Sequence, residues 1–213
     1  MSNALIIPIA LALMLLAEPG TAAEIRVLAD ADLDGWESKD FAGQTNYDAV
    51  TLDGHTVVRA HSKGGASGRF LEKDINLNAT PYLNWRWRVD NRLTGNAERE
   101  KSGDDYPARL YVVVSGGVFF WRTRAVNYVW SSQQAPGSHW PNAFTSNAQM
   151  LAVRGPDAAL GQWHVEKRNV REDFKKLFGS DITQINAIAF MTDTDNTGQE
   201  ATAYYGEIFF SSE

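Results

Sequence analysis

Cysteine is absent from this 213-residue sequence, and only four histidines occur. The absence of cysteine excludes disulfides, a thiol nucleophile, cysteine-ligated metal sites and the lipid anchor of a lipoprotein. The histidines lack the spacing of an H-E-x-x-H zinc motif, and there is no G-x-S-x-G motif for a serine nucleophile. The chain must therefore be held together by packing alone, without covalent or zinc cross-links.

Basic residues are also in the minority. Lys and Arg number 20 against 26 Asp and Glu, which makes the net charge −6, and no basic run occurs. An acidic chain of this kind is a poor nucleic-acid binder, so no nucleic-acid partner is expected. The glycine-rich stretch at residues 64–68 lacks the lysine and the following helix of a phosphate-binding loop.

The one long apolar run covers residues 4–17 and is followed by small residues. It predicts a signal peptide over residues 1–23, cleaved after Ala23, although no Lys or Arg precedes the run. A membrane anchor is the alternative, but the run is shorter than the ~20 residues of a spanning helix and contains Pro8. We expect one mature domain over residues 24–213, soluble in the periplasm or secreted, with no stable membrane insertion after cleavage.

Most of the mature sequence alternates with a period of two. In Tyr82 to Asp90, apolar residues alternate with polar ones, which predicts a strand with one buried face. A single helix is expected at about 171–178, stopped by Gly179. About nine strands and one short helix predict an all-β fold, an antiparallel β-sandwich of jelly-roll type. The other predicted strands are 55–61, 109–114, 118–122 (as a hairpin after Gly116-Gly117), 125–130, 149–154, 163–170, 182–192 and 201–210.

An acidic corner precedes the central strand. Asp104 and Asp105 lie just before a strand in which Arg109 and Tyr111 share a face. One interpretation is a ligand site, with Arg109 as a planar donor to hydroxyls or a carboxylate. The other is that one Asp pairs with Arg109 and fastens the corner while the second caps the turn. The sequence leaves both open.

Aromatic residues make up 11% of the chain, with seven tryptophans. Indole rings provide flat apolar surfaces on which sugars stack. Trp130 and Trp140 lie on or near a long loop, and we predict that they contact a ligand together with Asn127 and His139. The alternative is that the tryptophans fill the sandwich core.

The motif TDTDNTG lies near the C-terminus. Asp193, Asp195 and Thr197 occupy positions 1, 3 and 5 of a calcium loop, and Gly198 occupies position 6. Position 12 is Tyr204 instead of Glu, which excludes a full EF-hand. The alternative is a hairpin turn in which glycine supplies a positive φ. Calcium is the one cofactor that the sequence suggests.

Several motifs occur in one order: SGDDYPARLYVVV, NYVW, WPNAF, FG, MTDTDNTG and AYYGEIFF. In this order they resemble the bacterial domain-of-unknown-function family 3047 over nearly all of the mature chain. The resemblance implies an exported protein of β-sandwich type with no assigned activity. A looser, fold-level likeness links the chain to jelly-roll carbohydrate-binding modules.

Three functions fit these observations. The first is a non-catalytic module that binds a glycan or another polyhydroxylated ligand, with or without calcium. The second is a glycan hydrolase or lyase that uses an Asp of the 104/105 or 193/195 clusters. Neighbouring acids on a strand point to opposite faces, so such an enzyme would need a distant partner acid. The third is a structural envelope protein that binds a protein partner.

Overall fold

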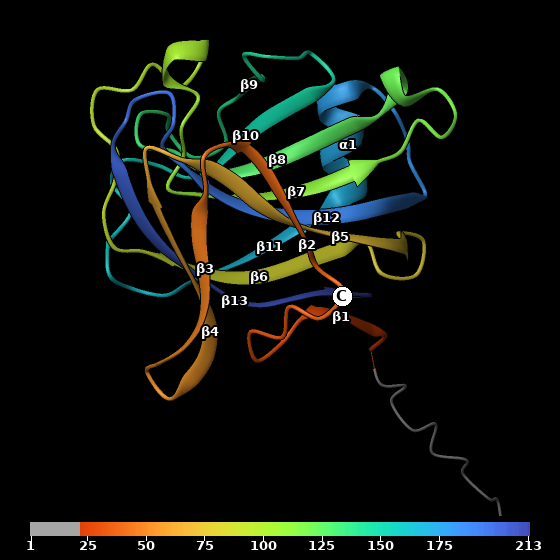
Figure 1. Cartoon of the computed structure of the whole chain (residues 1–213). Helices are drawn as coiled ribbons and strands as arrows, with labels where there is room; N and C mark the ends of the chain where they lie inside the picture. The colour runs from red at the N-terminus through yellow and green to blue at the C-terminus, as the bar shows by residue number, and fades with distance from the viewer. Residues whose placement is uncertain (1–21) are drawn as a thin grey trace, which may run out of the picture.

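A computed structural model describes residues 22–213 as two β-sheets packed face to face (Figure 1). Sheet A has six strands in the order β11-β6-β13-β4-β3, with β1 also paired to β13. Sheet B has seven strands in the order β2-β5-β12-β7-β8-β10-β9. The sheet A strands are β1 (Glu24–Leu28), β3 (Thr45–Leu52), β4 (His55–Lys63), β6 (Tyr82–Val89), β11 (His164–Asn169) and β13 (Glu200–Ser211). The sheet B strands are β2 (Glu37–Ala42), β5 (Ala66–Asn76), β7 (Ala108–Val114), β8 (Arg124–Trp130), β9 (His139–Pro141), β10 (Ala148–Arg154) and β12 (Gln184–Asp193).

Aromatic pairs hold the two sheets together. The alternation predicted for β6 is observed, with Trp85 and Trp87 on the buried face. Their rings meet β8 across the sandwich, with ring centroids 5.4 Å apart for Trp85 and Tyr128 and 6.0 Å apart for Trp87 and Trp130. Full burial of a large apolar side chain stabilises a fold by about 1.5–3 kcal/mol, so these rings are a main source of cohesion. The predicted all-β sandwich is confirmed.

The structure corrects the strand assignment in three places. β8 and β10 run parallel, whereas an antiparallel sandwich was expected throughout. Residues 118–122 do not form a strand: turn hydrogen bonds from Phe119 N–H to Gly116 O (3.1 Å) and from Arg122 N–H to Phe119 O (2.8 Å) close a loop that includes the 3-10 helix η2 (Phe120–Arg122). Strands β1, β2, β3, β5 and β9 were not predicted, and all six residues of β2 are exposed, so β2 shows no alternation of burial.

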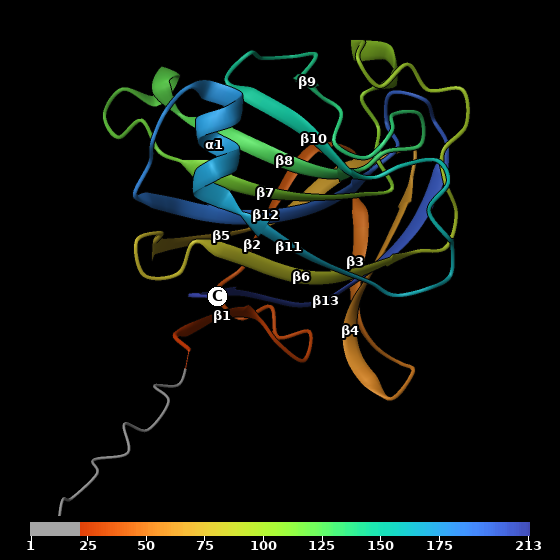
Figure 2. The ribbon, with the colours of Figure 1, turned by 180° about the vertical axis from the view of Figure 1, so that it is seen from behind.

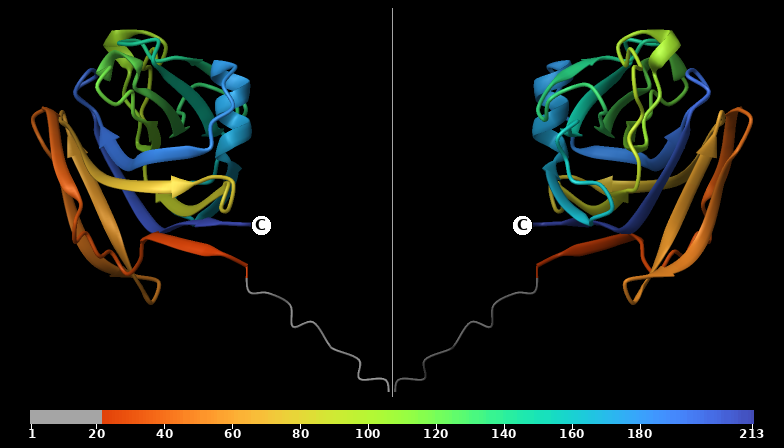
Figure 3. Two further views of the ribbon diagram at one scale, coloured as in Figure 1. Left: turned by 90° about the vertical axis from the view of Figure 1, so that its right-hand side faces the viewer. Right: turned by 90° about the vertical axis from the view of Figure 1, so that its left-hand side faces the viewer.

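Helix α1 (Val170–Phe178) confirms the predicted helix to within one residue. The side chain of Asn169 caps its start by accepting the Glu172 N–H (3.2 Å), and Gly179 ends it in the left-handed region at φ 66°. Phe174 packs into the sandwich core. Figures 2 and 3 show α1 at the end of the sandwich opposite the β3–β4 hairpin.

The outer face of sheet B carries several of the predicted site residues. Leu110 and Val112 of β7 point into the core, so Arg109 and Tyr111 face outward. Tyr111 lies beside Asn127 on β8, and Arg109 lies beside Met191 on β12. Side chains from three adjacent strands thus share one face.

The predicted signal peptide lies almost wholly outside the described residues. Between residues 22 and 213, no helix has the length and apolar character needed to cross a membrane.

Candidate functional site

Two loops meet at one end of sheet B. The first runs from the 3-10 helix η1 (Lys101–Gly103) into β7, and the second joins β12 to β13. The Asp193 N–H donates to the carbonyl of Tyr106 (3.2 Å), and the Tyr106 N–H donates to the Asp193 carboxylate (3.3 Å). These reciprocal bonds bring together two segments 87 positions apart in sequence.

Arg109 is buried at this corner, and its guanidinium bonds to other residues of the protein. Its Nε donates to Asp193 Oδ1 (2.7 Å), and a second N–H contacts the other oxygen of Asp193. A terminal N–H also donates to the backbone carbonyl of Asp104 (2.8 Å). Burial by itself lowers the pKa of Arg109. The surrounding groups, including Tyr111 and Asp104, raise this pKa by more than burial lowers it, so the guanidinium stays charged. The fastening interpretation of Arg109 matches this geometry, although its main partner is Asp193.

Asp105 caps the β12–β13 turn. Its carboxylate accepts the backbone N–H groups of Asn196 (3.1 Å) and Thr197 (2.7 Å) and the Thr197 hydroxyl (2.6 Å). Three donors satisfy most of the capacity of a carboxylate, so Asp105 has a structural role in this turn.

Two buried acceptor oxygens nearby have no hydrogen-bond partner within residues 22–213. They are Asp104 Oδ1 and Asn127 Oδ1, on side chains of residues that are 4% and 1% exposed. The other oxygen of Asp104 accepts from Asn142 Nδ2 (2.9 Å). A buried acceptor left unpaired costs free energy, and such atoms call for a ligand or ordered water.

Both oxygens belong to residues that line one cavity of about 440 Å³ on the outer face of sheet B. That volume lies within the range of small-molecule sites. Its remaining lining residues combine polar groups with an apolar wall. The polar ones are Arg109, Asn142, Thr145, Asp193, Asp195 and Asn196; the others are Phe41, Ala42, Ala66, Tyr111, Phe144, Ala148 and Met191.

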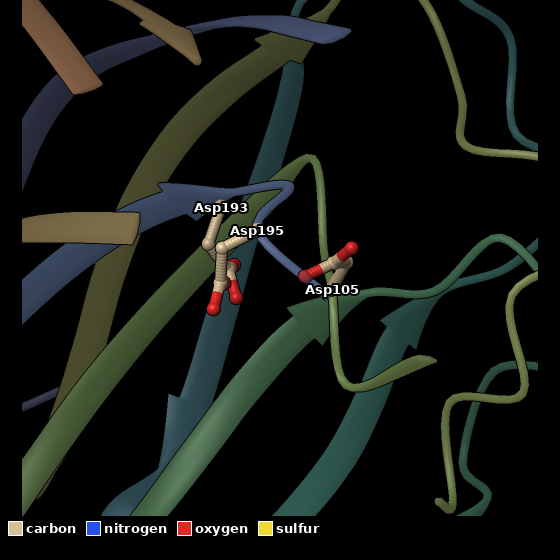
Figure 4. Close-up of side chains that lie close together, drawn as sticks. All are labelled: Asp105, Asp193 and Asp195. Atoms are coloured by element: carbon tan, nitrogen blue, oxygen red, sulfur yellow. The ribbon is translucent and has the colours of Figure 1, made fainter. Parts of the chain in front are cut away.

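Three carboxylates gather beside the cavity. Asp193 and Asp195 project side by side, and Asp105 lies opposite on the loop that leads into β7 (Figure 4). Each offers an oxygen within 4.8 Å of the others. Burial raises the pKa of Asp195, and the charge of Asp105 raises it further. The corner therefore concentrates negative charge that Arg109 only partly balances.

The predicted ligand residues divide into two groups. Asp104, Arg109, Tyr111 and Asn127 line the cavity together, whereas Asp105 does not line it but has an oxygen within 4.8 Å of the lining residues Asp193 and Asp195. His139 is exposed on β9 and does not line the cavity.

The predicted role of two tryptophans as stacking surfaces is wrong. Trp130 is 1% exposed and packs edge-on against Trp87 and His164, because it shares the inward face of β8 with Tyr128. Trp140 is 4% exposed and packs in a second apolar cluster with Tyr106, Val129, Met150 and Ala152. A ring buried in this way cannot present its face to a ligand.

Sequence reasoning missed Phe41, Asn142, Phe144 and Met191 as lining residues. Asn142 and Phe144 belong to the WPNAF motif inside the long loop, and this was the available signal for them. Phe41 gave none, because β2 lacks alternation of burial.

The TDTDNTG segment forms a turn, but not the hairpin turn of the alternative interpretation, because β12 and β13 belong to different sheets. Gly198 has φ 66° and its N–H donates to Thr194 O (2.9 Å). Calcium binding by Asp193, Asp195 and Thr197 stays a prediction. Asp193 already binds Arg109 through both oxygens, and the Thr197 hydroxyl donates to Asp105, so an ion would share these oxygens with their present partners.

Comparison with solved structures supports the jelly-roll architecture. The family 30 carbohydrate-binding module of a cellulosomal cellulase from Clostridium thermocellum has a TM-score of 0.53 and 13% identity, over 90% of this chain and 98% of that module. The family 11 module of another cellulosomal cellulase from Clostridium thermocellum has a TM-score of 0.50 and 10% identity, over 90% of this chain and 95% of that one. At such identities the likeness concerns the fold alone.

No curated protein matches the chain. A family model described as "Protein of unknown function (DUF3047)" matches residues 34–209, in agreement with the resemblance of the motifs. The chain belongs to this DUF3047 family.

Proposed function

We propose that this protein is a non-catalytic module that binds a glycan or another polyhydroxylated ligand in the cavity on the outer face of sheet B. The observation that carries the proposal is the pair of buried, unpartnered acceptors, Asp104 Oδ1 and Asn127 Oδ1, both belonging to residues that line this cavity. Sugar hydroxyls are donors of the kind that these oxygens lack.

The apolar wall suits the other side of a sugar ring. Tyr111 and Met191 line the cavity from the sheet, and the exposed rings of Phe41 and Phe144 line it as well. The C–H faces of a pyranose pack on such surfaces, while its hydroxyls bond to the polar side. The fold-level likeness to carbohydrate-binding modules agrees with this assignment but adds no residue to it.

Export to the periplasm belongs to the same proposal, since the apolar run at residues 4–17 supports a leader. Calcium does not form part of the proposed site. An ion at this corner would compete with Arg109 for the carboxylate of Asp193.

The test is glycan binding by the protein that starts at Glu24, screened on an array and measured by calorimetry. Asn127→Leu has nearly the same shape but removes the unpartnered oxygen, so we expect at least about tenfold weaker binding. Its melting temperature should be unchanged or higher, because the lost atom makes no hydrogen bond in the free protein.

The matched control is Asn46→Leu, the same replacement at an exposed position of β3 in sheet A. It should bind like the parent protein. Failure of the parent to bind any glycan, or full binding by Asn127→Leu, contradicts the proposal. Release of new reducing ends from a bound glycan would instead identify a hydrolase, for which Asp195 with its raised pKa is the available acid.

A further inference from the structure

The charges around the cavity are unbalanced. Asp104, Asp193 and Asp195 line it, and Asp105 has an oxygen within 4.8 Å of an oxygen of Asp195. Arg109 is the only base among the described residues that line it. Four carboxylates thus share one guanidinium, and Asp193 binds that guanidinium through both oxygens.

Two buried acceptors of the cavity are free to bind a ligand. Asp104 Oδ1 and Asn127 Oδ1 have no donor within the described part of the chain. Two of the nearby donor groups are already in use, since Asn142 donates to Asp104, and Arg109 donates to Asp193 and to the Asp104 backbone. A ligand that pairs with Asp104 Oδ1 must bring a hydrogen-bond donor, and the excess of carboxylates favours a donor with positive charge.

The two exposed rings beside the cavity suit the same chemistry. The ammonium group of Lys39 lies 5.7 Å from the ring centre of Phe41, and that of Lys101 lies 5.4 Å from the ring centre of Phe144. Each ring thus already accepts an ammonium group, by the attraction between a cation and an aromatic face. Both lysines are exposed, so solvent screens their charges, whereas Asp104 is buried and screened much less.

We propose that the ligand is an amine-bearing glycan, in which a free ammonium group binds between Asp104 and Asp195 while a neighbouring hydroxyl donates to Asn127. This inference rests on the proposed function and names the substrate class of the same cavity. A bound ammonium group would satisfy Asp104 Oδ1 and offset the repulsion that Asp195 experiences from Asp105 and Asp104.

The experiment compares three oligosaccharides of equal length that differ only at C2 of a β-1,4-linked glucose unit. They are glucosamine oligomers (amine), N-acetylglucosamine oligomers (acetamide) and cello-oligomers (hydroxyl). Calorimetry is run with a chelator present and at a pH where the amine is protonated. We expect the amine series to bind at least about tenfold more tightly than the other two, and the preference to shrink in high salt.

Two variants that each lose one carboxylate charge separate the effect of the charge inside the cavity from the effect of net charge. Asp195→Asn should remove the preference for the amine, so that this variant binds the amine series no more tightly than it binds the neutral oligomers. Asp48→Asn, which removes an exposed carboxylate on β3, should keep the preference.

The outcomes distinguish this inference from the function on which it rests. Equal affinity for all three series overturns the amine inference and leaves a glycan-binding module. No binding of any series overturns both. A calcium-dependent rise in melting temperature without amine preference identifies the acidic corner as an ion site and also overturns the inference.

Discussion

The outer faces of the two sheets carry similar residue types but treat their charges differently. On sheet A, Arg59 pairs with Asp48 (2.8 Å), and Arg88 pairs with Asp90 (2.7 Å) while stacking on the ring of Tyr204. These charges are exposed or half-buried, and each has a partner beside it. On sheet B, carboxylates outnumber bases and one of them keeps an unpartnered oxygen.

The unpartnered buried side-chain atoms sharpen this contrast. Among residues 22–213, those outside the cavity are N–H donors of Arg69, Trp85, Arg86 and Trp140. The guanidinium groups of Arg69 and Arg86 lie over the rings of Tyr47 and Trp163, which compensates them in part. The two acceptors both belong to residues that line the sheet B cavity. A face whose charged groups pair with one another needs no ligand, whereas a cavity with two unpartnered acceptors is suited to bind one.

The largest expected effect is a loss of stability when the buried ion pair of sheet B is broken, compared with an exposed ion pair of sheet A. Arg109→Met should destabilise the fold by about 3–5 kcal/mol, because it leaves the buried Asp193 without its cation. The exposed pair offers the control, since Arg59→Met should cost no more than about 1 kcal/mol. Urea denaturation of both variants measures the difference, and similar losses would remove the distinction between the two faces.

A change of pH should act on the cavity and much less on sheet A. Burial and Asp105 raise the pKa of Asp195 above its ordinary value. Between the pKa of Asp195 in the unfolded state and its higher pKa in the folded state, the folded protein holds a proton that the unfolded chain has released. The free protein therefore loses some stability as the pH rises through this range. An ammonium ligand needs the ionised form, so its affinity should fall as the pH is lowered through the raised pKa.

Calorimetry in buffers of different ionisation enthalpy checks this, because binding near that pKa should release protons. The Asp195→Asn variant should release fewer. Affinity for the amine series that stays constant across this pH range would show that Asp195 does not contact the ligand.

The smallest expected effect is that of calcium. Asp193 and Asp105 use their oxygens on Arg109 and on the β12–β13 turn, so excess calcium should leave the melting temperature where a chelator leaves it. A ligand present at 100 times its dissociation constant would add about 2.7 kcal/mol, which is readily seen in a thermal melt. A clear rise that disappears in Asp195→Asn would establish the ion site and rule out this expectation.

Local patterns in the sequence determined much of the fold. The alternation in β6 and the Gly179 stop of α1 are local features, and with the helical pattern of residues 171–178 they placed those elements to within one residue. The corner of Asp104, Asp105 and Arg109 was also visible, since it lies within a few residues of one strand.

Only the tertiary structure decided which distant residues become partners. Asp193 neutralises Arg109 from 84 positions away, and Asp105 caps a turn 92 positions away, because β7 and β12 are neighbours in sheet B. Strand order also sent Trp130 into the core opposite Trp87 and brought Phe41 to the cavity from a strand without alternation of burial. Periodicity fixes which face of a strand is apolar, whereas the neighbour on that face depends on strand order, and a local pattern does not encode that order.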